Sequence, residues 1–294
     1  MSGFDVIVCG SLHLDIMLYA PSLPRSDETV AGSRWEQKCG GKGGNQAVMA
    51  ARAGARVAMI GRIGADDFGR RLQANLAAAG VDRSAVFVDP NAGSGMSAAI
   101  VRDDGDYGAV IVSGSNLGID PESVGPQWRT LGGARVLVLQ NEIPEAVNVA
   151  AARAAKADGA LVILNAAPAR PVSAALLDRI DVLVVNRVEA EMLSGASVQT
   201  REAAVAALPR LRGRGRAVII TLGAAGLVIQ PAGDALPVPI AAHAVKVAST
   251  HGAGDCFVGV LAARLARGDP LVGAAEFANA AAAKYVSGEP FARA

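Results

Sequence analysis

The sequence predicts an α/β fold in which a doubly wound sheet lies between two layers of helices, in the order α/β/α, beside a small second β-sheet. Short apolar runs alternate with alanine-rich stretches of helical length along most of the 294 residues. Such alternation is typical of repeated β–α units that build a parallel sheet. The apolar runs are nearly continuous, as expected of strands that helices cover on both faces.

The strands and helices of the main sheet are expected to follow one another in turn. The stretch Asp66–Ala79 has two acidic residues in its first turn and Gly80 after its end, which are typical helix start and stop signals. Further helices are expected at Pro144–Ala157, at Val172–Ile180, after Val185 as far as Leu193, and at Arg201–Leu211. Strands are expected at Val6–Val8, Arg56–Ile60, Arg135–Leu139, Ala160–Leu164, Asp181–Val185 and Arg216–Thr221.

Two segments interrupt this alternation. Residues Leu12–Cys39 show no helical pattern and predict two extended runs around a turn at Pro21–Pro24. Residues Gly95–Gly114 predict a hairpin whose strands, Met96–Arg102 and Tyr107–Val112, are joined by a turn at 103–106.

We expect the two segments to pair as a small separate sheet. This sheet would form a β lid, residues 12–39 and 95–114, over the carboxyl ends of the main strands, where ligands bind in this architecture. Residues 1–11, 40–94 and 115–294 would then form the main α/β domain.

Composition excludes several classes of protein. The 28 basic and 27 acidic residues nearly cancel and aromatic residues are only 4%, which argues against nucleic acid as a partner. No apolar run approaches the roughly 18 residues of a membrane-spanning helix, so no membrane partner is expected. Cys9, Cys39 and Cys256 lack metal or redox spacing, and the N-terminus lacks the pattern of a signal peptide. We therefore expect a cytoplasmic protein with reduced cysteines.

The first glycine-rich motif is Gly40–Gln46, followed by the helical Ala47–Ala53. Glycines allow a ligand to approach the backbone closely, and a following helix offers free N–H groups. The motif is not a P-loop, because Gly43 follows Lys42 where a P-loop needs Ser or Thr. The simpler interpretation is a tight strand-to-helix turn.

The second glycine-rich motif is Thr250–Asp255, which leads into the helical Cys256–Leu265. Small residues at a helix start leave consecutive N–H groups uncovered, and these suit a phosphate or a developing negative charge. Asp255 beside them could take a proton from a hydroxyl that attacks phosphorus. The alternative is an acid that only stabilises the helix start.

Other polar residues follow predicted strands. Asn186 and Glu189, three residues apart on one helix face, could hold a hydrated Mg²⁺ near phosphates, or could simply begin a helix. Asp15 and Glu142 also follow strands and suit the hydroxyl groups of a polyol, unless they are solvated loop acids. The three histidines show no metal spacing. We expect Trp35, Trp128 and Cys256 to be packing residues.

Taken in order, these motifs resemble the ribokinase family, the PfkB-type carbohydrate kinases. Gly40–Ala53 and Ser249–Gly259 resemble its two signatures, and Asn165–Arg170 and Thr221–Gly223 resemble further ribokinase stretches. The resemblance runs from Val6 to about Ala283. It implies a ribokinase-like fold, a homodimer formed through the β lid, and ATP-dependent phosphorylation of a sugar hydroxymethyl group.

The resemblance also implies a role for each site residue. Asp255 would be the general base, beside an anion hole of the backbone N–H groups of Gly252, Ala253 and Gly254. The residues that would hold the sugar are His13, Asp15, Gly41, Lys42, Asn45, Glu142 and Asp255. Those that would contact ATP are Asn186, Thr221, Gly223, Ala224, Ala225, Gly226, Leu227, Val228, Gly254 and Asn279. Glu189, with Asn186, would order Mg²⁺ through water.

Three departures from the family pattern matter. His13 stands where ribokinases usually have Asn, so we expect the substrate to be ribose or a related small sugar. Ser249 replaces an Asp that helps to build a monovalent-cation pocket, and the residues from Ser287 onward do not match the rest of that pocket. Since a missing carboxylate weakens cation binding, we expect weak or absent activation by K⁺.

Three other functions compete with a sugar kinase. A nucleoside kinase would share the fold, although the motif at Gly40–Asn45 resembles ribokinase more closely. A non-catalytic sensor of a sugar or nucleotide is disfavoured because Asp255 and the neighbouring glycines are present. A nicotinamide dehydrogenase is disfavoured because Cys9–Leu12, after the first strand, carries a single glycine.

Overall fold

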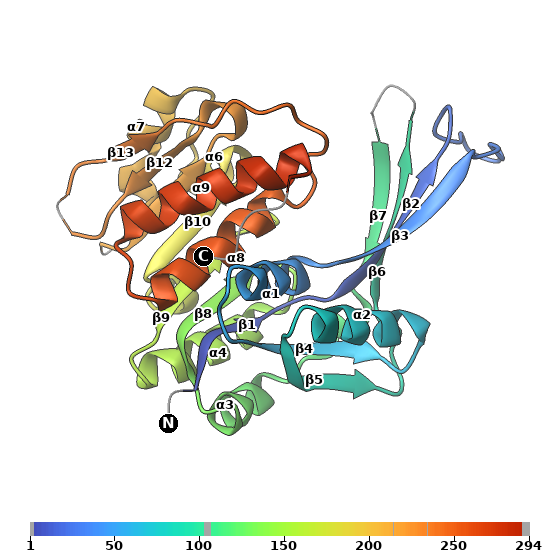
Figure 1. The fold of residues 1–294 in the computed structure, drawn as a ribbon, viewed down its shortest axis with the longest axis horizontal. Helices are drawn as coiled ribbons and strands as arrows, with labels where there is room; N and C mark the ends of the chain where they lie inside the picture. The colour runs from blue at the N-terminus through green and yellow to red at the C-terminus, as the bar shows by residue number, and fades with distance from the viewer. Residues whose placement is uncertain (1–2, 103–106, 214, 234, 290–294) are drawn as a thin grey trace.

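The structure, a computed structural model, describes residues 3–102, 107–213, 215–233 and 235–289, so the predicted turn at 103–106 lies outside it. Within these residues the larger sheet has the strand order β13-β12-β11-β10-β9-β8-β1-β4-β5 (Figure 1). Its strands are β1 (Phe4–Cys9), β4 (Val57–Gly64), β5 (Asp82–Asp89), β8 (Ala134–Gln140), β9 (Leu161–Asn165), β10 (Val182–Asn186), β11 (Ala217–Thr221), β12 (Leu227–Gln230) and β13 (Val238–Ile240). All neighbours pair in parallel except β12 and β13, which form an antiparallel edge.

Helices cover both faces of this sheet. One layer holds α1 (Lys42–Arg52), α2 (Asp67–Ala78), α8 (Ala253–Ala266) and α9 (Leu271–Ser287). The other holds α3 (Pro121–Thr130), α4 (Glu145–Ala157), α5 (Ala174–Leu177), α6 (Arg187–Ser194) and α7 (Arg201–Leu211). Two short 3₁₀ helices are η1 (Gly114–Gly118) and η2 (Gly223–Ala225). None of the described helices has the combination of length and apolar character that crossing a bilayer requires.

The near-continuous apolar strands explain the three layers. In β1, Val6 and Val8 pack in the core beneath α1 and α8, whereas Ile7 and Cys9 pack in the core beneath α3 and α4. Successive side chains of a strand point to opposite faces, so a strand that is apolar throughout is buried on both. The predicted doubly wound α/β fold is therefore confirmed.

A second sheet projects from the main body (Figure 1). This small sheet has the order β3-β2-β6-β7 and consists of β2 (His13–Tyr19), β3 (Arg34–Gly40), β6 (Gly95–Val101) and β7 (Tyr107–Val112). Asn116 joins the residues before β2 to the residues after β7 by hydrogen bonds. Its Oδ1 accepts from the Leu12 N–H (2.9 Å), and its Nδ2 donates to the carbonyls of Leu12 and Ser113 (2.9 Å each).

Three local expectations are wrong. The helix predicted at Val172–Ile180 shrinks to Ala174–Leu177, because the chain tightens into turns with Arg179 N–H bonded to the Leu176 carbonyl (2.9 Å) before β10. The helix predicted to start at Ala47 begins already at Lys42, inside the glycine motif. Trp35 is not a packing residue: it lies on β3 with 64% of its surface exposed, whereas Trp128 is buried as predicted.

Candidate active site

Asp255 lies in the first turn of α8. The helix is preceded by Gly252, whose φ of 79° is in the left-handed region. Its side chain is only 8% exposed, and both oxygens accept hydrogen bonds from amides of α1. Asn45 Nδ2 donates to Oδ2 (2.9 Å) and Gln46 Nε2 donates to Oδ1 (2.9 Å). Each carboxylate oxygen keeps a further lone pair for another donor.

The surroundings of Asp255 favour a base. Burial is the largest influence and raises the pKa of its carboxyl above the ordinary Asp value. Glu142 raises this pKa further, while Lys42, Asn45 and Gln46 lower it. A carboxylate with a raised pKa accepts a proton more readily than an ordinary Asp, provided that it is ionised at the working pH.

The N-terminus of α8 opens onto a polar cavity of about 190 Å³. Besides Asp255, its lining includes Lys42, Asn165, Asn186, Glu189, Thr221, Thr250, Gly252, Ala253 and Gly254. The backbone N–H of Ala253 donates to the Thr250 carbonyl (3.3 Å), so this member of the predicted anion hole is engaged within the turn. The positive end of the helix dipole points into the same cavity.

A second, larger cavity of about 500 Å³ adjoins the first. The two share Thr221, Thr250, Ala253, Gly254 and Phe257, so they form one continuous cleft. Of the residues predicted to contact ATP, those that line the larger cavity are Thr221, Gly223, Ala224, Gly226, Leu227, Gly254 and Asn279. Asn186 lines the smaller cavity. Ala225 and Val228 line neither, because Val228 is fully buried within β12 and the Ala225 carbonyl accepts from Arg201 (2.8 Å).

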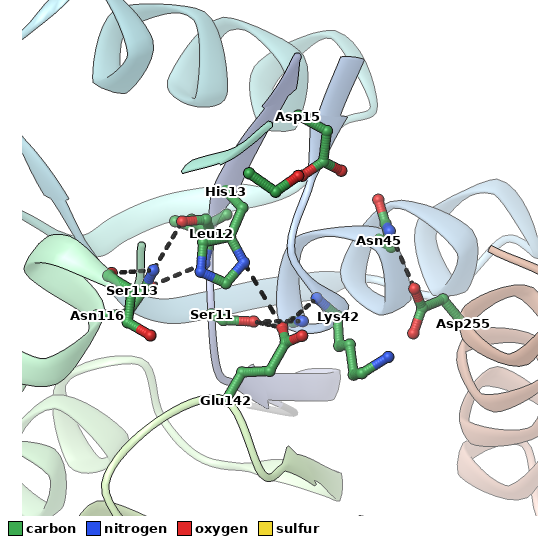
Figure 2. Close-up of polar contacts among 12 residues, drawn as sticks. Ser11, Leu12, His13, Asp15, Lys42, Asn45, Ser113, Asn116, Glu142 and Asp255 are labelled. Atoms are coloured by element: carbon green, nitrogen blue, oxygen red, sulfur yellow. Dashed lines mark hydrogen bonds and ion pairs between the residues drawn. The ribbon is translucent and has the colours of Figure 1, made fainter. Parts of the chain in front are cut away.

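Glu142 forms the centre of a second polar cluster (Figure 2). Its Oε2 accepts from Ser11 Oγ (2.5 Å) and from the backbone N–H of Lys42 (2.9 Å), and His13 Nδ1 lies 3.7 Å from the same oxygen. His13 Nε2 is buried and has no hydrogen-bond partner among the described residues. The fold thus brings His13, Lys42 and Glu142 together from three separate parts of the chain.

Asp15 lies on β2 of the small sheet, apart from the Glu142 cluster (Figure 2). Its Oδ1 accepts from Ser97 Oγ (2.5 Å) on the neighbouring strand β6. Gly40 leaves room for this carboxylate, because a methyl group there would lie 2.0 Å from Asp15 Oδ2.

Comparison with known proteins decides the family. The pfkB family carbohydrate kinase profile matches residues 4–289. Ribokinase of Mus musculus is 35% identical over 263 residues, 89% of this chain and 81% of the mouse protein. Deoxyribokinase of Salmonella typhi is 32% identical over 260 residues, 88% of this chain and 84% of that protein. The solved structure of Arabidopsis thaliana ribokinase complexed with ribose and ATP has a TM-score of 0.88 and 29% identity, covering 97% of this chain and 93% of that one.

The chain belongs to the pfkB family of carbohydrate kinases. It is an ATP-dependent sugar kinase, a phosphotransferase, as the sequence motifs implied. The predicted ribokinase-like fold is confirmed as well.

The first glycine motif does not offer this kinase an open anion site. The three N–H groups that begin α1 are already bonded: Lys42 to Glu142, Gly43 to Ser11 Oγ (3.3 Å) and Gly44 to the Ser11 carbonyl (2.9 Å). The expectation of free amides at this motif is therefore wrong, because the chain supplies its own acceptors. What the glycines do allow is close approach: a methyl group at Gly41 (φ 81°) would lie 2.7 Å from the His13 backbone nitrogen.

Asn186 and Glu189 form a capping box at the start of α6. Asn186 Oδ1 accepts from the Glu189 N–H (3.0 Å), and Glu189 accepts from both the backbone N–H (2.8 Å) and the side-chain amide (2.9 Å) of Asn186. Burial raises the pKa of the Glu189 carboxyl, with Lys42 lowering it and Asp255 raising it. The helix-start interpretation is thus confirmed, and it leaves the carboxylate facing the cavity beside Asp255.

Sequence reasoning missed four polar residues of this kinase. Ser11 is bonded to Glu142, and Ser97 is bonded to Asp15. Gln46 is bonded to Asp255 and also to Asn165. Ser11 follows an apolar strand and Asn165 ends one, which is the same signal that indicated Asp15, Glu142 and Asn186. Ser97 carries no local signal, because its role depends on the pairing of β2 with β6.

Proposed function

We propose that this kinase transfers the γ-phosphate of ATP to the hydroxymethyl group of ribose or a closely related pentose. The observation that carries the proposal is the position of Asp255. It lines the smaller cavity at the N-terminus of α8, next to Ala253 and Gly254, which line both cavities. The curated relatives named ribokinase and deoxyribokinase, and the Arabidopsis complex with ribose and ATP, support this substrate class.

In the proposed reaction the sugar hydroxyl attacks the γ-phosphorus, and its proton passes to Asp255. The new oxygen–phosphorus bond forms as the bond from the γ-phosphorus to the bridging oxygen of ADP breaks. Charge on the transferred group would be stabilised by the N–H groups of Gly252, Ala253 and Gly254, with Ala253 first leaving Thr250, and by the dipole of α8. Phosphoryl transfer depends mainly on such positioning and charge stabilisation.

The nucleotide would occupy the larger cavity, against the loop Gly223–Leu227 and Asn279. Mg²⁺, which neutralises phosphate charge when bound, would be held through water by Glu189 with Asn186. The donor set fits this arrangement, because Mg²⁺ usually keeps several waters and takes few protein ligands. The described residues contain no cluster of three or more His, Cys, Asp or Glu that could hold a metal ion by themselves.

The sugar would lie between the small sheet and α1. Carboxylates of Asp15 and Glu142 would accept from its hydroxyls, with Lys42, Asn45 and the backbone at Gly41 completing the site. The match to a deoxyribokinase supports 2-deoxyribose as a second candidate.

The small sheet would act as the β lid, residues 12–39 and 95–114, closing over the sugar to keep water from the transferred phosphate. It exposes the apolar side chains of Leu18, Trp35 and Val110. Exposed apolar groups gathered on one sheet suit contact with another protein surface. A homodimer joined through this sheet is therefore part of the proposal. Action in the cytoplasm is part of it as well, because Cys9, Cys39 and Cys256 are all free cysteines.

A substrate panel tests the proposal. ADP release is measured with Mg²⁺ and ATP on ribose, 2-deoxyribose, other aldoses and ketoses, and nucleosides. We expect the highest kcat/KM for ribose or 2-deoxyribose. A nucleoside as the best substrate, or ATP turnover independent of any sugar, would contradict the substrate assignment.

A further inference from the structure

Gln46 is fully buried in α1 and touches Asp255 from the side of the sheet. Its carboxamide makes three hydrogen bonds. Nε2 donates to Asp255 Oδ1 (2.9 Å) and to Asn165 Oδ1 (3.0 Å), while Oε1 accepts from Gln140 Nε2 (2.8 Å). Both hydrogens of the amide are therefore in use, and one of them holds the carboxylate.

The ends of two neighbouring strands determine which way this amide faces. Gln140 ends β8 and Asn165 ends β9, and the two residues are paired in register. Asn165 Nδ2 donates to the Val184 carbonyl (3.3 Å), which leaves Oδ1 to accept from Gln46. A reversed Gln46 amide would set its oxygen against two acceptors and its NH₂ against the NH₂ of Gln140.

In this arrangement the side-chain oxygen of Gln140, Oε1, is buried and is left without a hydrogen bond from the described residues. Buried polar atoms without partners are uncommon in folded proteins and are unfavourable. The oxygen packs against Gly10, where a methyl group would lie 1.9 Å away. The amide of Gln140 is thus held with its donor toward Gln46.

We propose that Gln46, backed by Gln140, is a positioning residue that holds the Asp255 carboxylate in the orientation from which it meets the substrate hydroxyl. The inference rests on the proposed role of Asp255 as the base. Asn45, which is only partly buried, holds the other oxygen and in the proposed site also contacts the sugar. Gln46 is fully buried and has no proposed contact with the sugar.

Gln46 also affects the pKa of Asp255, together with the charged groups around this carboxylate. Lys42, Glu142, Glu189, Cys256 and Tyr285 all interact electrostatically with this carboxylate. Burial raises the pKa of Asp255, and the hydrogen bond from Gln46 lowers it. Loss of the N–H donor would therefore raise the pKa further and protonate the base at a higher pH.

The primary test is Gln46→Met, which keeps the length of the side chain and removes the donor. We expect kcat to fall by about 10- to 100-fold, with KM for sugar and ATP within about twofold. The acid-side midpoint of the kcat–pH profile should rise by about one unit. The control is Gln127→Met, which removes a buried amide of α3 bonded to Ser123 and should leave kcat and the midpoint unchanged.

Gln140→Met is the second variant and keeps the inference testable if Gln46→Met does not fold. If Gln140 acts through Gln46, its substitution lowers kcat in the parent enzyme and adds nothing in the Gln46→Met background. Normal kcat in a folded Gln46→Met, equal losses in Gln127→Met, or simple additivity in the double variant would overturn the inference.

Asp255→Asn, measured in parallel, separates this inference from the proposed function. If Asp255→Asn loses turnover while Gln46→Met and Gln140→Met keep it, only the positioning role fails. If Asp255→Asn retains near-normal kcat, the proposed base and the positioning role both fail.

Discussion

The glycine-rich starts of α1 and α8 are alike in sequence and opposite in use. Each helix follows a glycine with a positive φ, Gly41 at 81° and Gly252 at 79°. At α1 the first N–H groups are taken by Glu142 and Ser11, which the chain itself provides. At α8 they border the cavity that contains Asp255.

The difference shows that a glycine-rich helix start indicates close packing before it indicates an anion site. Gly41 lies against the backbone of Leu12 and His13, whereas Gly252 lies against the side chain of Tyr285. The first motif therefore holds the polar residues of α1 beside Glu142. The second leaves a helix dipole directed at the cleft.

Asp255→Asn should have the largest effect. We expect a folded protein that still binds sugar but loses about 10²- to 10⁴-fold in kcat, the contribution of a well-placed base. Steady-state kinetics and sugar binding by calorimetry measure both. Asp67→Asn, which changes an exposed first-turn acid of α2, is the matched control and should keep full activity. Near-normal kcat in Asp255→Asn would contradict the role of the α8 site.

Gly252→Ala should lower kcat by about 10- to 100-fold, because a side chain here is strained and displaces the start of α8. The added methyl would lie 2.8 Å from Tyr285 Oη, a side chain that can move. In Gly41→Ala the methyl would meet backbone 2.7 Å away, so the free energy of unfolding should fall more there. Kinetics and thermal unfolding of both variants check the contrast, which equal losses of stability would refute.

The kcat–pH profile should show an acid limb with a midpoint above the ordinary Asp value of 3.8, since burial raises the pKa of Asp255. Below that pKa the carboxyl is protonated and cannot accept the hydroxyl proton, so kcat falls about tenfold per pH unit. Direct detection of ADP at saturating substrates over pH 4–9 (about the range in which the protein should stay folded) measures it. A kcat that shows no acid limb down to about pH 4 is the result that this assignment does not allow.

Glu142→Gln should act mainly on the sugar. An amide NH₂ would face the donors Ser11 and Lys42, so we expect KM for sugar to rise about tenfold with a smaller change in kcat. Glu122→Gln, an exposed acid on α3, is the control for loss of charge. A fall in kcat as large as that of Asp255→Asn would show that Glu142, beside the start of α1, is needed for phosphoryl transfer and not mainly for sugar binding.

Potassium should have the smallest effect. Ser249 stands where the resemblance to ribokinases implies the Asp of a cation pocket, and the Val286 carbonyl accepts from the N–H groups of Ala248 (2.7 Å) and Ser249 (3.2 Å). We expect less than about twofold activation by K⁺ over a bulky organic cation at equal ionic strength. Strong stimulation would show that the start of α8 depends on a bound cation.

Much of the site could be predicted because its residues stand in short motifs. Asp255, Lys42, Asn45 and Glu189 were found from their neighbours in sequence, and the structure places all four within reach of one cleft. Ser11 and Ser97 were missed, since their acceptors Glu142 and Asp15 lie 131 and 82 residues away. Gln46 stood inside a recognised motif, but only the packing of α1 on α8 shows that it holds Asp255.

The sequence by itself determined the layers of this protein, because a strand that is apolar throughout must be covered on both faces whatever its neighbours are. It also determined that two helices start with glycine. Only the tertiary structure decided that the first N–H groups of α1 are taken by Glu142 and Ser11, whereas the start of α8 borders the cleft. That outcome depends on whether a distant acceptor, here Glu142 after β8, is carried to the helix end, and hydrogen bonds between remote segments exist only once the strands have their order.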